Sequence, residues 1–142
     1  IVITELGLDL TKFPTERHFV SWLRLVPRRG KSAGKQLRKR NGTGSTRIGN
    51  LLRLSARSMA RSRSALGAAY RRVSRNKGAS VAILATARKI AQLIYRMLRF
   101  GQDYTDIGEE AYEARFLERR MAGLERTATS LGYALVPATP PG

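Results

Sequence analysis

The sequence predicts an all-α protein, a compact helical domain that carries a long basic, glycine-rich loop and ends in a long helix. Apolar residues recur every three or four positions in several separate stretches, which is the period of an amphipathic helix. The alternating pattern of a half-buried strand is nearly absent. The length of 142 residues, of which 42% are hydrophobic, suits one domain with a modest core.

The amino-terminal region contains two predicted helical segments. Residues 1–6 are apolar and have no capping residue before them, so we expect the tail of a helix that begins upstream of a truncated chain. Thr15 is expected to cap a second helix, which Pro27 ends. Trp22 on this helix is expected to pack in the core, with His18, four residues earlier, at the edge of the same face.

Three more helices are predicted between the basic loop and residue 101. The first is expected to be capped by Asn50 and to run to about Arg61, and the second to span about 64–76. The third, about 80–100, has apolar residues over well over half of its circumference, which predicts the buried centre of the fold, closed by Gly101. No acid lies near its arginines in the sequence, so we expect them to be unpaired.

The last predicted helix contains both acids and bases. We expect Asp106 to open it and Glu109 to complete a capping box. Apolar residues recur in steps of three and four from 107 to 131, which predicts lengthwise packing on another helix, in this chain or in a second copy. Residues 137–142 are expected to be a disordered tail.

The charge points to a polyanionic partner. The net charge is +17 at pH 7, and the window from Arg17 to Gln102 holds 22 of the 27 Lys and Arg residues without one Asp or Glu. A folded region of one sign repels itself unless a polyanion supplies the opposite charge, so nucleic acid is the expected partner. An anionic membrane and an unspecific basic surface of the ribosomal-protein kind are the alternatives that charge leaves open.

Several classes of protein are disfavoured by what the sequence lacks. Without cysteine there is no disulfide and no Cys-based zinc site. No apolar run reaches the roughly 18 residues of a membrane span, and no basic signal-peptide start is present, so we expect a cytoplasmic protein with no membrane partner. A single histidine, with carboxylates confined to the two ends, argues against a catalytic metal cluster in the basic middle.

The basic loop, residues 28–50, is the candidate functional region. Its five glycines allow backbone N–H groups to approach phosphates closely, and its cations can neutralise their charge. Ser32 lies between Lys31 and Lys35, which could stabilise the charge that grows on a phosphodiester during attack by a hydroxyl. From the residues alone, Ser32 is either a nucleophile or a hydrogen-bond donor to phosphate.

Five motifs in a fixed order, spread over about residues 3–136, resemble a known family. They are FPTERHFVSWLRLVP, KSAGK, GSTRIGN, RSRSALGAAYRRV and ATARKIAQLIYRMLRFGQDY. Together they resemble the C-terminal domain of the insertion-sequence-110 (insertion-sequence-116/110/902) family of transposases, the bridge-RNA-guided DNA recombinases. The resemblance implies a helix-hairpin-helix-like remnant at the amino terminus and an upstream RuvC-like domain with four metal-binding acids, where Mg²⁺ is expected. It also implies a serine nucleophile, whose motif falls on Ser32 and Gly34.

The resulting hypothesis is DNA transposition or site-specific recombination by a serine domain over residues 1–136. The domain is expected to bind DNA and a guide (bridge) RNA, to contain no metal or cofactor of its own, and to need the RuvC-like domain for activity in a homo-oligomer. Ser32 is the predicted catalytic residue. The predicted nucleic-acid contacts are Arg28, Arg29, Lys31, Lys35, Arg38, Lys39, Arg40, Arg47, Arg53 and Arg57. The alternatives are a non-enzymatic basic helical DNA- or RNA-binding module and a scaffold whose last helix pairs with a partner.

Overall fold

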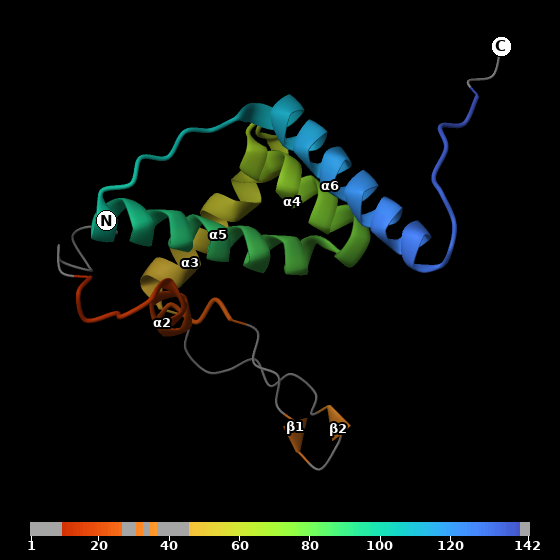
Figure 1. The fold of residues 1–142 in the computed structure, drawn as a ribbon. Coiled ribbons are helices and arrows are strands. Elements are labelled where there is room, and N and C mark those ends of the chain that lie inside the picture. The colour runs from red at the N-terminus through yellow and green to blue at the C-terminus, as the bar shows by residue number, and fades with distance from the viewer. Residues whose placement is uncertain (1–9, 27–30, 33–34, 37–45, 140–142) are drawn as a thin grey trace.

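The all-α fold class is confirmed by a computed structural model that describes residues 10–26, 31–32, 35–36 and 46–139 (Figure 1). The described residues form helices with one pair of two-residue strands. In chain order the elements are α2 (Glu16–Trp22), β1 (Lys31–Ser32), β2 (Lys35–Gln36), α3 (Arg47–Ser58), the 3-10 turn η1 (Met59–Arg61), α4 (Ala65–Lys77), α5 (Ala79–Phe100) and α6 (Gly108–Ser130). None of the helices in these segments is both long and apolar enough to cross a bilayer.

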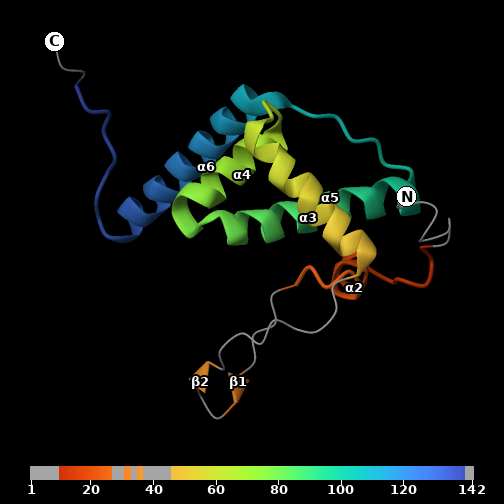
Figure 2. The same ribbon diagram turned by 180° about the vertical axis from the view of Figure 1, so that it is seen from behind.

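Helix α5 is the centre of the molecule, as its apolar circumference predicts. Helices α2, α3 and α4 all contact α5, whereas α6 packs lengthwise on α4. Figures 1 and 2 show α3 crossing α5 and the β1–β2 pair lying outside the helical body. The long carboxy-terminal helix is therefore present, and its partner within this chain is α4.

The core lies where α2, α3 and α5 meet. Ala87 and Ala91 of α5 are fully buried, and their small side chains let the neighbouring helices approach closely. The buried Tyr95 hydroxyl donates a hydrogen bond of 2.6 Å to the Phe13 carbonyl, so its polar group is satisfied. The buried cluster comprises Leu10, Phe13, Phe19, Val20, Leu23, Leu25, Ile48, Leu52, Ala56, Ala87, Ala91 and Tyr95.

Helix α2 begins at the predicted cap but ends early. Thr15 caps it as expected, whereas the helix stops at Trp22 because Arg24 adopts a left-handed backbone conformation with φ of 56°. The turn at Arg24 buries Leu25 completely and leaves Val26 exposed. Trp22, predicted to lie in the core, is 43% exposed in the last turn of the shortened helix, so that prediction is wrong.

The cap predicted for α3 is wrong, whereas the cap predicted for α4 is correct. Thr46, not Asn50, caps α3, and its hydroxyl accepts a 3.0 Å hydrogen bond from the Gly49 N–H. Asn50 lies one turn further on and accepts a hydrogen bond from Arg53 instead. Ser64 caps α4 at the predicted position.

Helix α6 starts without the predicted capping box. Its cap residue, Ile107, makes no side-chain hydrogen bond. The Asp106 carboxylate instead accepts a 2.9 Å hydrogen bond from the Ala65 N–H at the start of α4, and Glu109 pairs with Arg71 of α4. The Asp106 carboxylate is favourable at the start of α4, because the first turn of α4 has no acid of its own.

Candidate nucleic-acid interface

Ser32 lies in a short antiparallel strand pair within the basic loop. Lys31 of β1 is opposite Gln36 of β2, and Ser32 is opposite Lys35, with two residues between the strands. The backbone register therefore brings Ser32 and Lys35 to paired positions. The side chains of these four residues are outside the described part.

The predicted phosphate contacts fall into two groups. One lies outside the described residues: Arg28, Arg29, Arg38, Lys39 and Arg40. The other lies on α3, where Arg47 and Arg57 are exposed. Arg53 is half-buried and already engaged, because it donates to the Arg24 carbonyl at 2.9 Å and to Asn50 Oδ1 at 3.2 Å. Their role as nucleic-acid contacts stays a prediction.

The two ends of the basic loop are joined where α2 meets α3. Thr46, which caps α3 near the end of the basic loop, donates its hydroxyl to the Leu23 carbonyl at 3.4 Å. Gly49 permits this approach, since a Cβ at that position would lie 2.5 Å from the Leu23 oxygen. The chain before residue 27 and the chain after residue 45 are therefore held together at this point.

Two arginines from other helices hold the next two carbonyls after α2. Arg53 of α3 donates to the Arg24 carbonyl, and Arg88 of α5 donates from Nε and from a terminal nitrogen to the Leu25 carbonyl, each at 3.2 Å. These carbonyls follow the end of α2 and have no helical partner, so the arginines satisfy them. The three contacts from Thr46, Arg53 and Arg88 are called the loop anchor below, and they fix the base of the loop.

One α5 arginine has an acidic partner, contrary to the sequence prediction. Arg96 Nε lies 2.7 Å from Glu16 Oε2, and a second nitrogen of Arg96 lies 3.1 Å from Oε1. The hydrogen bond from Arg96 lowers the pKa of the Glu16 carboxyl and raises the pKa of Arg96. The prediction failed because the partners are far apart in the sequence and meet only when α2 packs on α5.

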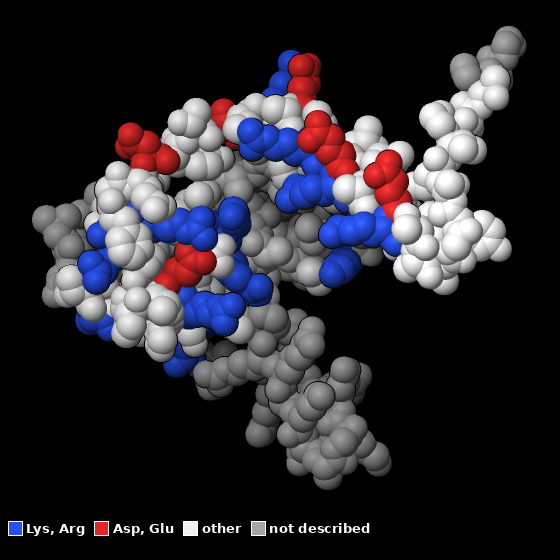
Figure 3. Space-filling model, in the orientation of Figure 1, with Lys and Arg blue, Asp and Glu red and all other residues white. Residues whose placement is uncertain are grey.

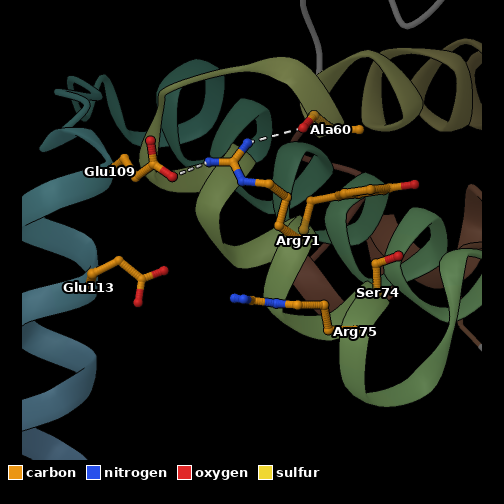
Figure 4. Close-up of a pocket in the computed structure, with 7 residues that line it drawn as sticks. Ala60, Arg71, Ser74, Arg75, Glu109 and Glu113 are labelled. Carbon is orange, nitrogen blue, oxygen red and sulfur yellow. Dashed lines mark hydrogen bonds and ion pairs between the residues drawn. The ribbon is translucent and has the colours of Figure 1, made fainter.

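A second charged region lies between η1, α4 and α6, around a cavity of about 610 Å³ (Figure 4). Arg71 pairs with Glu109 at 2.6 Å and also donates to the Ala60 carbonyl at 3.1 Å. Arg72 pairs with Glu113, and its guanidinium lies 3.1 Å from the Phe116 ring centroid. These contacts neutralise charge and hold α6 on α4, so this cavity is less suited to a polyanion than the basic loop.

The exposed cations are spread over the helical body. In Figure 3, Lys and Arg atoms gather in two areas of the visible face, one over α2 and α5 and one over α4 and α6, with some acidic atoms in each. Within the described ranges, no group of three His, Asp or Glu side chains lies close enough to hold a metal ion.

Sequence reasoning missed the loop anchor and the exposure of Trp22. Thr46 carried a usable signal, since threonine is a preferred cap residue and stands just before an apolar-periodic segment. Arg88 carried none, because the carbonyl it binds is far away in the sequence and any residue can supply a carbonyl.

Comparison with known proteins identifies a matching family for this chain. Residues 1–72 match the family described as Transposase IS116/IS110/IS902, which is slightly more than half of the 142-residue chain. The matched part includes α2, the whole basic loop and α3. No curated protein and no solved structure matched the chain.

Proposed function

Because the chain belongs to the Transposase IS116/IS110/IS902 family, we propose that it is the strand-joining domain of a guide-RNA-directed DNA recombinase, with Ser32 as its nucleophile. Family membership shows a role in transposition or recombination and, with it, contact with DNA. The observation that carries the finer proposal is the register of β1 and β2, in which Lys35 pairs with Ser32 at the base of a two-residue connection. A hydroxyl flanked by lysines in a loop with a fixed base suits attack on a phosphodiester.

The proposed step is a transesterification at phosphorus. The Ser32 oxygen forms a bond to phosphorus, the bond from phosphorus to a deoxyribose oxygen breaks, and that oxygen leaves with a proton. The serine proton passes to a base outside the described residues. Lys31 and Lys35 neutralise charge on the phosphoryl oxygens, and attack by a deoxyribose hydroxyl on the serine–DNA link reverses the chemistry and joins the new strand.

A metal ion in this reaction would belong to another domain. The acids of α6 that face α4 are engaged by Arg71 and Arg72, and no ligand cluster exists among the described residues. We therefore assign Mg²⁺ to the upstream RuvC-like domain that the family resemblance implies.

Guide RNA and self-association complete the proposal. If base pairing to a guide RNA selects the target, the protein needs to read little more than the shape and charge of the strands, which suits a chain of net charge +17. A homo-oligomer is supported by the apolar side chains that α6 leaves exposed, namely Leu117, Met121 and Leu124.

The decisive experiment is Ser32→Ala in the protein joined to its RuvC-like domain. We expect loss of the covalent DNA–protein product with nearly unchanged DNA affinity, measured by denaturing gel and by filter binding. Ser55→Ala, which removes an exposed hydroxyl from α3, is the matched control and should retain the covalent product. Covalent product that persists in Ser32→Ala rejects the role.

The rival function is a binding module without chemistry, which the positive charge alone would also favour. For both functions, neutralising about six phosphates predicts that log affinity falls against log salt with a slope near −5. Only the rival predicts that neither wild type nor Ser32→Ala forms a covalent DNA–protein product, because its serine is merely a phosphate contact.

A further inference from the structure

Trp22 occupies an unusual position for the largest side chain of the protein. It is the only tryptophan in the chain and ends α2. Phe13 and Phe19, both buried, lie beside it with ring centroids at 5.4 and 6.5 Å, whereas Trp22 itself is 43% exposed. The fold thus supports the indole from the core while leaving much of it in contact with solvent.

A cation accompanies this exposed ring. The Lys12 ammonium lies 5.9 Å from the Trp22 ring centroid and 5.6 Å from that of Phe13, and the Lys12 side chain is exposed. Among the described residues, the acid nearest along the chain is Glu16, which is paired with Arg96. An aromatic face beside a mobile cation is the combination that binds a base and its phosphate in single-strand-binding proteins.

Trp22 lies next to the base of the loop. It immediately precedes the three carbonyls of the loop anchor, and the loop that follows them contains Ser32. A strand bound by the loop, as the proposed function requires, would start or end beside the exposed indole.

From these contacts we infer that Trp22 and Lys12 form a stacking site for one unpaired nucleobase next to the base of the loop. The inference deepens the proposed function and rests on its contact with nucleic acid. In a duplex each base is already stacked on its neighbours, so only an unpaired or flipped-out base offers a free face to the indole. The flexible Lys12 side chain then moves from the ring to the phosphate of the same nucleotide.

The single tryptophan makes the test direct, because all tryptophan fluorescence of the chain comes from Trp22. The unmodified 142-residue chain is titrated with a single-stranded DNA, an RNA of the same sequence, and an abasic DNA strand of the same length. We expect the base-containing strands to quench the emission at saturation and the abasic strand to bind with little quenching. The stronger quencher of the two base-containing strands identifies DNA or RNA as the source of the base.

A pair of variants tests how much Trp22 contributes to the affinity for a base-containing strand. Trp22→Ala should weaken binding of the base-containing strand about 5- to 150-fold, as loss of one stacked base does, and leave binding of the abasic strand unchanged. Tyr133→Ala, which removes a 75% exposed ring from the carboxy-terminal segment, is the matched control and should have no effect.

The outcomes separate this inference from the proposed function. Salt-dependent binding with equal quenching by base-containing and abasic strands, or with no quenching, overturns the stacking site and leaves the proposed function intact. Absence of binding to any strand overturns both. Because quenching is measured on the unmodified chain, the test stands even where Trp22→Ala perturbs folding.

Discussion

The contact of α2 and α3 with α5 and the contact of α6 with α4 are built from different interactions. The first is closed by apolar side chains, of which Leu23, Ala56 and Ala91 are fully buried. The second depends on ion pairs and on stacking of Arg72 over aromatic rings, and α6 has no buried residue. Apolar burial is not weakened by charge screening, whereas partly exposed ion pairs are screened by salt.

The difference separates the roles of the two regions. The loop anchor is attached to the apolar region, so the base of the loop that contains Ser32 stays fixed even when charges are screened. Helix α6 is attached by charge and leaves its apolar side chains outward. Added salt should therefore weaken the contact of α6 with α4 more than the contact of α2 and α3 with α5.

The largest expected effect is the difference in stability loss between a leucine-to-alanine substitution in the core and the same type of substitution on α6. Leu52→Ala, at a residue 4% exposed in the core, should lower the free energy of unfolding by about 2–5 kcal/mol, because it leaves a cavity. Leu117→Ala, at a residue 60% exposed on α6, should change it by less than about 0.5 kcal/mol. Urea denaturation measures both, and equal losses would contradict the distinction between the regions.

Alanine substitutions at two glycines should change the free energy of unfolding in opposite directions. Gly49→Ala should destabilise the fold by about 1–3 kcal/mol, because its Cβ would lie 2.5 Å from the Leu23 oxygen and 2.9 Å from Thr46 Oγ1. Gly123→Ala on α6 meets nothing within 4 Å and should stabilise by about 0.5–1 kcal/mol through the better helix propensity of alanine. The same denaturation experiment measures both, and a stabilising Gly49→Ala would show that the α2–α3 approach is loose.

The loop anchor gives a third, smaller effect. Arg88→Ala should lower the free energy of unfolding by about 1–2 kcal/mol, because it removes both donors to the Leu25 carbonyl. The loss is limited because the site is partly exposed and water can replace the donors in part. Arg57→Ala, at an exposed arginine of α3, is the control for lost charge and should be nearly neutral. An equal loss in both variants would assign the effect to charge and not to the anchor.

The sequence predicted the elements with local causes. The expected span 80–100 and the observed α5, Ala79–Phe100, agree closely because apolar periodicity and the closing glycine are local signals. The cap of α4 at Ser64 was also correct for this reason. The early end of α2 was missed, because a left-handed Arg24 is favourable only when Leu25 is buried by other helices.

The candidate site was less predictable than the fold. The basic loop and Ser32 were identified from composition and motif order. The family match covers both, and the role of Ser32 stays a prediction. The pairing of Ser32 with Lys35 and the arginines of the loop anchor could not be derived, since they depend on backbone geometry and on residues distant in the sequence. Asp106 was misassigned because its choice between two helix starts is decided by the packing of α6 on α4.

The smallest effect concerns Glu16 and Arg96, the one ion pair that the described residues form on the apolar side. Since Arg96 lowers the pKa of Glu16 in the folded state, the pair stabilises the protein above the ordinary titration range of a glutamate and loses its effect as the pH falls through the lowered pKa. With side chains 28% and 42% exposed, the pair is screened, so Glu16→Gln should cost at most about 1 kcal/mol at neutral pH. The difference from wild type should close in acid, measured by urea denaturation at a series of pH values. Glu118→Gln is the control, because Glu118 is an exposed acid of α6 with no ion pair in the described part of the chain. Its difference in stability from wild type should not change with pH in this way. If the stability difference between Glu16→Gln and wild type instead widens in acid, the Glu16 carboxylate is not stabilised by Arg96.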